Sequence, residues 1–189
     1  MSEHIVGVQQ KEYKGVKYKS NLEADTAEFL DKLGIPWKYE AKTYTLLNSF
    51  YSKYQKRKVM PIEYTPDFFI GPIMIEMKGY ETPDWKIKKK FFFKLLSEQE
   101  PDAIWYMAKS LAQLILYLDN HWCSIGKIIQ VTSKETKKEP AVTYTFSSFK
   151  EALKQLKLEN KPFGRILRSL TGDVQYVYNY NWKLININI

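Results

Sequence analysis

The stretch from residue 64 to residue 79 constrains the fold of this 189-residue chain more than any other. Two short runs rich in aromatic and β-branched residues flank Gly71 and Pro72, a pattern typical of two antiparallel strands joined by a tight turn. Asp67 begins the first run, and Glu76 and Lys78 interrupt the second. Because side chains two apart leave the same face of a strand, we expect Glu76 and Lys78 to lie side by side, facing Asp67 across the hairpin.

This arrangement predicts an acidic pocket with one cation at its rim. Oxygen ligands suit a divalent metal, so we expect Asp67, Glu76 and the backbone carbonyl of Met77 to hold Mg²⁺, with Mn²⁺ able to substitute. Such a metal polarises a phosphate and lowers the pKa of a bound water, while Lys78 orients that water or offsets charge in the transition state. The alternative interpretation is a surface strand with its charges on the solvated side.

Composition indicates a folded protein with a polyanionic partner. Hydrophobic residues make up 44% of the chain and aromatic residues 15%, which is typical of a globular domain. A net charge of +8 favours nucleic acid, although solubility alone also explains it. The single cysteine, Cys123, provides no disulfide framework, and neither a transmembrane-length apolar run nor a signal-peptide pattern is seen. We therefore expect an intracellular protein that is not secreted and has no membrane partner.

Apolar residues recur at helical spacing from residue 21 to residue 33, which predicts a helix. Ser20 or Asn21 can cap its start, and Gly34 can end it. Glu23 lies in the first turn, where the helix dipole favours a carboxylate. A second interpretation makes Glu23 a further acidic ligand or water holder in the metal pocket.

The next segments predict a strand followed by a long basic loop. Residues 35–47 alternate apolar and polar side chains, and Glu40 within them either reaches the site or faces solvent. Residues 48–62 have no clear period, which predicts a loop, either solvated or functional. Cations interleaved with tyrosines can pair with phosphates and stack on sugars or bases. The cations expected to bind DNA there are Lys53, Lys56, Arg57 and Lys58.

Thr82 and Pro83 predict the start of a helix that continues to Leu96. Its lysines form a basic face near Lys78, and those expected to bind DNA are Lys86, Lys89 and Lys90. Beyond it, the sequence predicts a buried strand at 102–108, a helix at 111–118 and a strand at 127–131. This part of the chain therefore alternates β and α elements.

A polar, charged segment at 132–141 predicts a linker between a core of residues 1–131 and a small unit of residues 142–189. In the small unit, a helix from 149 to 156 and a second from 163 to 170 are separated by a break at 160–162, and a strand follows at 174–184. Two short helices with a tight break form a candidate helix-turn-helix, or a plain packing unit. The residues expected to contact DNA are Lys161, Arg165 and Arg168.

The order of motifs resembles a known nuclease superfamily. Leu22-Glu23-Ala24, Trp37-Lys38-Tyr39-Glu40, Tyr64-Thr65-Pro66-Asp67-Phe68 and Glu76-Met77-Lys78-Gly79 together resemble the PD-(D/E)XK superfamily, in particular its phage endonuclease I (Holliday-junction-resolving) branch. The resemblance implies an α/β fold with a restriction-endonuclease-like mixed sheet flanked by helices. It also implies that Glu23, Asp67, Glu76 and Lys78 form the active site. The chain departs from the family in the basic segment 48–62.

The tail is similar to the small modular DNA-binding repeat of homing endonucleases, through residues 146–152, 166–171 and 180–183. The two resemblances imply a Mg²⁺-dependent endodeoxyribonuclease that hydrolyses phosphodiester bonds in double-stranded DNA, site-specific and homing-type, in the cytoplasm of a bacterial or phage-infected cell. Because one pocket cuts one strand, we expect a homodimer, and no nucleotide cofactor. A junction-resolving phage endonuclease and a catalytically silent DNA-binding protein are the alternatives.

Overall fold

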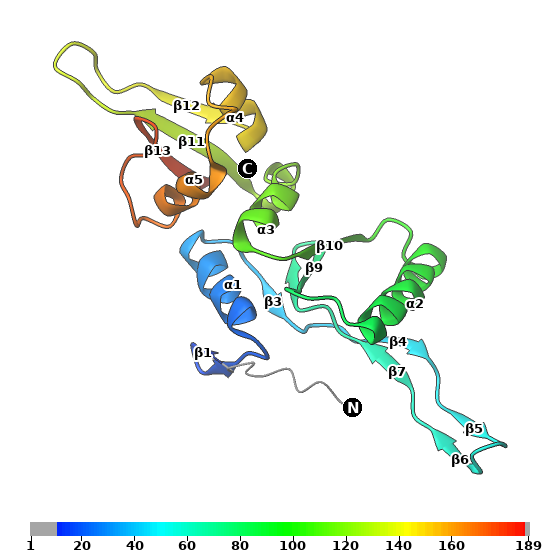
Figure 1. Cartoon of the computed structure of the whole chain (residues 1–189). Coiled ribbons are helices and arrows are strands. Elements are labelled where there is room, and N and C mark those ends of the chain that lie inside the picture. The colour runs from blue at the N-terminus through cyan, green and yellow to red at the C-terminus, as the bar shows by residue number, and fades with distance from the viewer. Residues whose placement is uncertain (1–10, 188–189) are drawn as a thin grey trace. The chain divides into compact units, whose positions relative to one another are not determined.

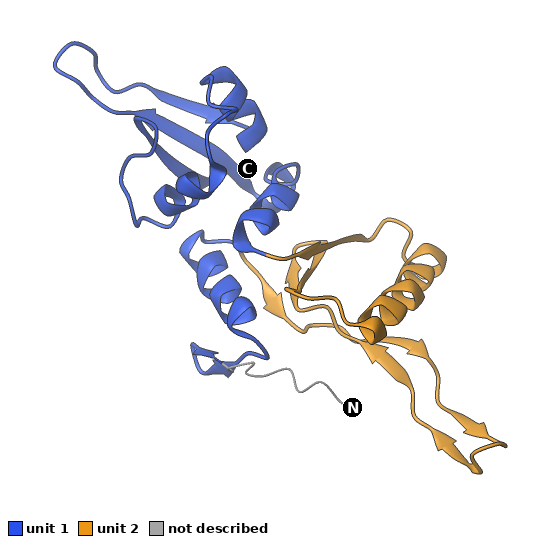
Figure 2. Cartoon of the chain, viewed as in Figure 1, with its two compact units in different colours: residues 1–35, 110–189 blue, residues 36–109 orange. Residues whose placement is uncertain are grey.

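The computed structural model describes residues 11–187 and has a mixed α/β fold. The chain forms two compact units, shown in different colours in Figure 2. The described residues of unit 1 are 11–35 and 110–187, and unit 2 consists of residues 36–109. Over residues 11–187, no helix combines the length and the apolar character needed to cross a membrane.

Unit 2 is built on a four-stranded mixed sheet with the strand order β10-β9-β8-β3. The central strand β9 pairs antiparallel with β8 and parallel with β10. The predicted hairpin is confirmed, with its turn at Gly71, whose φ of 56° is in the left-handed region that glycine adopts without strain. The strands of the sheet are β3 (Lys38–Tyr39), β8 (Phe68–Ile70), β9 (Ile73–Met77) and β10 (Ile104–Ala108).

Helix α2 (Pro83–Gln99) packs against one face of this sheet, as Figure 1 shows. Its predicted start is confirmed, because the Thr82 hydroxyl accepts a hydrogen bond from the Trp85 backbone N–H at 3.2 Å. The helix contributes three buried apolar side chains to a shared core. The core residues are Trp85, Phe92 and Leu96 from the helix, with Tyr44, Tyr64 and Met74 from the strands.

A two-part antiparallel ribbon extends from unit 2 (Figure 1). β4 (Tyr44–Leu47) pairs with β7 (Ile62–Tyr64), and further out β5 (Phe50–Ser52) pairs with β6 (Arg57–Val59). The predictions of one strand over 35–47 and of a loop over 48–62 are therefore wrong. Glu40, with a left-handed φ of 45°, separates β3 from β4, and cross-strand pairing satisfies the backbone groups of the segment expected to be a loop.

Unit 1 combines a capped helix with a three-stranded antiparallel sheet in the order β12-β11-β13. The helices predicted near residues 21–33, 111–118, 149–156 and 163–170 are confirmed. The elements of unit 1 are β1 (Glu12–Tyr13), β2 (Val16–Lys17), α1 (Asn21–Lys32), α3 (Leu111–Leu118), the 3-10 turn η1 (Cys123–Ile125), β11 (Lys127–Ser133), β12 (Thr143–Phe146), α4 (Phe149–Gln155), α5 (Phe163–Leu170) and β13 (Tyr180–Asn186).

An aromatic cluster joins α4 to this sheet. The Phe149 ring lies 5.9 Å from the Trp122 ring and 6.3 Å from the Trp182 ring, measured between centroids. Residues 134–142, which include most of the predicted linker, connect β11 to β12 within this one sheet. The last strand begins at Tyr180, later than predicted, because the residues before it form a turn with Val177 bridged to Tyr180.

Asp119 fixes the start of α4. Its buried carboxylate accepts hydrogen bonds from the Trp122 indole N–H at 3.0 Å and from the backbone N–H groups of Phe149 and Lys150 at 2.6 and 3.0 Å. These backbone groups belong to the first turn of a helix, where an N–H has no partner within the helix itself. Asp119 therefore links the end of α3 to α4.

Replacing Asp119 with alanine leaves these buried donors without an acceptor. We expect Asp119→Ala to lower the free energy of unfolding by about 2–4 kcal/mol. Asp119→Asn keeps one acceptor oxygen and should lose less, and Glu135→Ala, at an exposed position, should change the value by less than about 0.5 kcal/mol. Urea unfolding monitored by circular dichroism measures all three. Equal midpoints for Asp119→Ala and the parent chain would contradict this role.

Candidate functional site

Strand register places Asp67 and Glu76 on one face of the unit 2 sheet. Phe68 pairs with Ile75 across the β8–β9 hairpin, and continuing this register by one residue sets Asp67 opposite Glu76. Directly opposed residues of an antiparallel pair point to the same face, which here is the face of Met74, packed by α2. Both acids are buried, with 7% of Asp67 and 4% of Glu76 exposed.

The Asp67 carboxylate replaces a missing strand partner. β8 begins at Phe68, so Met77 lies beyond the last paired position of β9 on that side. Asp67 Oδ2 accepts the Met77 backbone N–H at 2.7 Å, in a buried hydrogen bond. A side chain that completes a backbone ladder in this way is held in one orientation, and the preceding Pro66 restricts the chain further.

A tyrosine holds the Glu76 carboxylate. The Tyr64 hydroxyl donates to Glu76 Oε2 at 2.9 Å and accepts from the Trp105 indole N–H at 3.0 Å. Burial, and after it the negative charges of Glu76 and Asp67, raise the pKa of Tyr64 far above its ordinary value. The hydroxyl therefore stays protonated and donates to Glu76 across the physiological pH range.

Lys78 follows β9 and supplies the cation of the site. Its backbone N–H donates to the Ala108 carbonyl at 2.9 Å, which continues the β9–β10 pairing and keeps its side chain on the same face as Glu76. The Lys78 ammonium lies 3.7 Å from Glu76 Oε1 and 4.8 Å from the centroid of the Trp85 ring. The predicted proximity of Glu76 and Lys78 is confirmed.

The Trp85 indole N–H has no acceptor. Among the buried side-chain polar atoms of residues 11–187, it is the single one without a hydrogen-bond partner. A buried donor without a partner costs free energy, and native proteins tolerate few of them. The Trp85 ring lies under the Lys78 ammonium, so the orphaned donor is part of the wall of the site.

The charges of the site favour a cation. Two buried carboxylates share a face with one ammonium, which leaves these three side chains with one net negative charge, and burying charge costs free energy unless it is compensated. Within the described part of the chain, no three His, Cys, Asp or Glu side chains gather into a metal-binding group. A pair of carboxylates still fits Mg²⁺, which commonly keeps several waters and uses one or two carboxylates together with substrate phosphates.

Glu23 belongs to unit 1, whereas Asp67, Glu76 and Lys78 belong to unit 2. It forms a capping box at the start of α1: Ser20 Oγ accepts the Glu23 backbone N–H at 3.2 Å, and the Glu23 carboxylate accepts from the Lys19 backbone N–H at 3.2 Å and the Ser20 hydroxyl at 2.8 Å. Only 5% of Glu23 is exposed. These contacts explain the residue structurally, and its proposed role in the metal pocket stays a prediction.

The residues expected to bind DNA fall into three groups. One group lies on the outer part of the ribbon, one on α2 and one on or just before α5. On α2, Lys89 forms an ion pair with Glu81, while Lys86 and Lys90 are exposed. The groups are Lys53, Lys56, Arg57 and Lys58 on the ribbon, Lys86, Lys89 and Lys90 on α2, and Lys161, Arg165 and Arg168 in unit 1.

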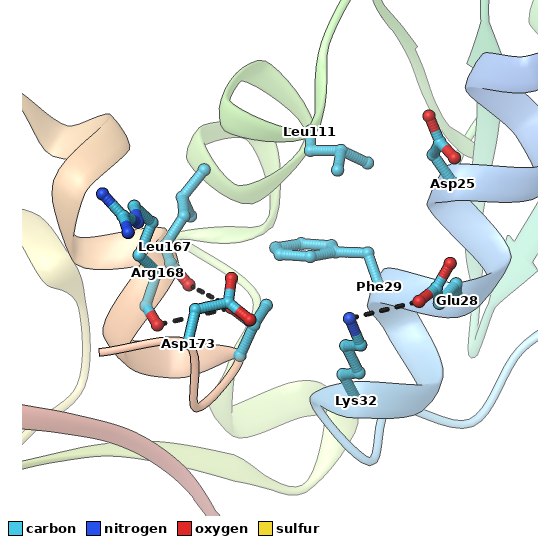
Figure 3. Close-up of a pocket in the computed structure, with 9 residues that line it drawn as sticks. Asp25, Glu28, Phe29, Lys32, Leu111, Leu167, Arg168 and Asp173 are labelled. Atoms are coloured by element: carbon cyan, nitrogen blue, oxygen red, sulfur yellow. Dashed lines mark hydrogen bonds and ion pairs between the residues drawn. The ribbon is translucent and has the colours of Figure 1, made fainter. Parts of the chain in front are cut away.

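A pocket of about 270 Å³ in unit 1 lies between α1, α3 and α5 (Figure 3). Phe29 projects from α1 into it, and Arg168 lines it on the side of α5. Three acids also line it, which makes it a poor site for a phosphate: Asp25 and Glu28 on α1, and Asp173 beyond α5. Lys11 forms ion pairs with the first two acids, at 2.6 and 3.6 Å.

The sequence analysis did not identify the aromatic residues that position the predicted charged side chains. Tyr64, Trp85 and Trp105 hold or flank the charged groups, yet in sequence each is an aromatic residue in an apolar pattern. Only Trp85 carried a local signal, because it lies three residues after the cap Thr82, in the first turn of the helix that follows Lys78. The contacts of the two other residues depend on strand pairing.

Comparison of the chain with protein families, curated proteins and solved structures finds no match. The function of the chain is therefore inferred from its own residues. The three charged side chains of unit 2, Asp67, Glu76 and Lys78, form the arrangement that points most directly to a chemistry.

The capping box predicts a difference between two substitutions of Glu23. Glutamine keeps one oxygen to accept the Lys19 N–H, and its NH2 group can donate to the Ser20 hydroxyl, whereas alanine can do neither. We expect Glu23→Ala to lower the free energy of unfolding by about 1 kcal/mol and Glu23→Gln to lower it by less than about 0.5 kcal/mol. Urea unfolding provides the measurement. An equal loss in both variants would show that the charge of Glu23, and not its hydrogen bonds, stabilises the helix.

Proposed function

We propose that this chain is a Mg²⁺-dependent endodeoxyribonuclease whose active site contains Asp67, Glu76 and Lys78. The observation that carries the proposal is the group of two buried carboxylates on one sheet face, with an ammonium 3.7 Å from Glu76. The resemblance of this sequence pattern to PD-(D/E)XK nucleases supports the same chemistry. In that interpretation the sheet of unit 2 and α2 are part of a restriction-endonuclease-like core.

The donor set suits a hard divalent cation. Asp67, Glu76 and the carbonyl of Met77 would hold Mg²⁺ or Mn²⁺ through oxygen atoms. When bound, the metal would supply Lewis-acid polarisation of a phosphate and a coordinated water of lowered pKa. Glu23 is proposed as a further carboxylate of the site.

The residues of the chain have separate roles in this proposal. The Lys78 ammonium offsets negative charge that develops on the phosphate, or orients the attacking water. Trp85 lies against that ammonium, and Tyr64 fixes Glu76 through a hydroxyl that remains protonated. The Asp67 bond to the Met77 amide fixes the other carboxylate, so the groups are held before the substrate arrives.

Charge supports double-stranded DNA as the substrate. The chain carries a net charge of +8, and cations neutralise backbone phosphates without regard to sequence. The pair α4 and α5, with Arg165 and Arg168 exposed on α5, is proposed as a helix-turn-helix module that gives site preference, as in homing-type enzymes. Because one site cuts one strand, a double-strand break requires a homodimer or two successive cuts.

Cleavage of supercoiled plasmid in the presence of Mg²⁺ tests the proposal. We expect Asp67→Asn and Glu76→Gln each to lower the rate by about 100-fold or more, because both variants keep the hydrogen-bond acceptor and lose the charge. Lys78→Met should also lose activity, while Lys94→Met, at an exposed position of the same unit, should not. EDTA should abolish cleavage, and Mn²⁺ should restore it.

The outcomes separate the competing functions. A four-way junction cut much faster than linear duplexes would favour a junction-resolving enzyme. Binding of DNA without cleavage in Mg²⁺ or Mn²⁺ would contradict the proposal and indicate a catalytically silent DNA-binding protein. Cleavage by Asp67→Asn at the parent rate would also contradict it.

The role of Glu23 has its own test. Glu23→Gln keeps one acceptor oxygen and a group that can hydrogen-bond Ser20, and it removes the charge, so a loss of activity in this variant with little loss of stability is not explained by a lost cap. We expect it to lower plasmid cleavage by about 10-fold or more, while the free energy of urea unfolding falls by less than about 0.5 kcal/mol. Parent-like cleavage would assign Glu23 to the helix start alone.

A further inference from the structure

The outer part of the ribbon in unit 2 is an exposed two-stranded hairpin, which we name the basic arm (residues 48–60, Figure 1). Phe50 pairs with Val59 and Ser52 with Arg57, so these side chains share one face, while Tyr51 and Lys58 are paired on the other. A four-residue turn, residues 53–56, forms the tip. Both faces therefore present an aromatic residue and a cation.

The basic arm lacks the support that such a hairpin ordinarily has. Large apolar side chains on it are exposed: Tyr54 at the tip is 100% exposed, Met60 68%, Tyr51 66% and Phe50 49%. An isolated two-stranded hairpin is of marginal stability in water, and strands usually bury at least one face. A patch of this kind, rimmed by polar residues, marks an interaction surface.

The charge of the basic arm identifies the class of partner. Lys53, Lys56, Arg57 and Lys58 are its ionisable cations, and the chain has no acidic residue between Glu40 and Glu63. The same arm of a second copy carries the same charges and would be repelled. Cations alternating with exposed aromatic rings match a polyanion with apolar surface between its charges, which describes nucleic acid.

We propose that the basic arm inserts into the major groove of duplex DNA as a two-stranded ribbon and holds the duplex beside the catalytic sheet. This inference rests on the proposed function. The major groove is about 12 Å wide and about 8.5 Å deep and admits a two-stranded β-ribbon. The two strands of the arm, β5 and β6, pair over three residues each. At about 3.3 Å per residue this paired part is about 10 Å long, which fits within the groove.

The arm is directly connected to the candidate active site. It continues into β7, which ends at Tyr64, and the Tyr64 hydroxyl donates to Glu76 at 2.9 Å. A duplex held by the arm is thereby tethered through one short strand to the residue that orients a catalytic carboxylate. The arm thus sets where along the DNA the sheet of unit 2 is held.

The test measures binding of the full chain to a duplex in EDTA, in an Asp67→Asn background that does not cleave. The arm variant carries Lys53→Gln, Lys56→Gln, Arg57→Gln and Lys58→Gln. The control variant carries Lys17→Gln, Lys134→Gln, Lys137→Gln and Lys138→Gln, which remove the same charge from exposed positions of unit 1 outside the proposed helix-turn-helix module. We expect the arm variant to reduce the slope of log Kd against log salt by about 3.6, since each of the four lost phosphate contacts contributes about 0.9.

A second comparison assigns the groove. The same duplex is prepared with glucosylated 5-hydroxymethylcytosine, which fills the major groove, and the ordinary duplex is also titrated with netropsin, which fills the minor groove. We expect the sugar to weaken binding of the parent and control chains by about 10-fold or more, to leave the arm variant unaffected, and netropsin to have little effect on any of them.

Three results would overturn the inference. The arm variant keeps the affinity and salt slope of the parent chain, the sugar does not weaken DNA binding by the parent chain, or the arm substitutions weaken binding of single-stranded DNA only. If the four substitutions perturb folding, a variant with residues 50–59 replaced by Asn-Gly ends the ribbon early and answers the same question. Because no cleavage is required, failure of the arm and failure of the nuclease proposal are distinguishable.

Discussion

Two carboxylates buried on one face of a sheet are the constraint on which the candidate site depends. Asp67 and Glu76 are less than a tenth exposed, and buried charge is tolerated only where hydrogen bonds or opposite charge compensate it. The Met77 backbone N–H donates a hydrogen bond to Asp67. The Tyr64 hydroxyl donates to Glu76, and the Lys78 ammonium forms an ion pair with it. Each of these compensating groups is itself fixed by strand pairing or aromatic packing, so site and sheet form together.

This constraint connects stability to function. A buried acidic pair lowers stability when nothing compensates it, and a bound cation would relieve that cost while performing the proposed chemistry. The aromatic residues around the pair, Tyr64, Trp85 and Trp105, both complete the core under α2 and hold the charged groups in place. Packing and preorganisation are therefore supplied by the same side chains.

Unit 1 provides a contrast, because its glutamates at helix starts stabilise those helices through local hydrogen bonds. Glu23 caps α1 and Glu151 caps α4, where hydrogen bonds from Ser147 hold the pKa of Glu151 below its usual value. The same sequence signature, serine three residues before glutamate, accounts for both. A glutamate in a motif that matches a nuclease family can thus also satisfy the first turn of a helix, and only a substitution that preserves the cap separates the two roles.

What the sequence determined by itself is local. Helix starts at Ser20 and Thr82, the turn at Gly71, and the shared face of Glu76 and Lys78 follow from capping chemistry, backbone freedom and the two-residue period of a strand. Only the tertiary structure decided which segments pair. Residues 48–62 belong to an antiparallel ribbon and not to a loop, and the Tyr64 hydroxyl donates a hydrogen bond to Glu76. Such contacts depend on which strands pair and in what register, and the burial and pairing that select them leave no periodic mark on either segment.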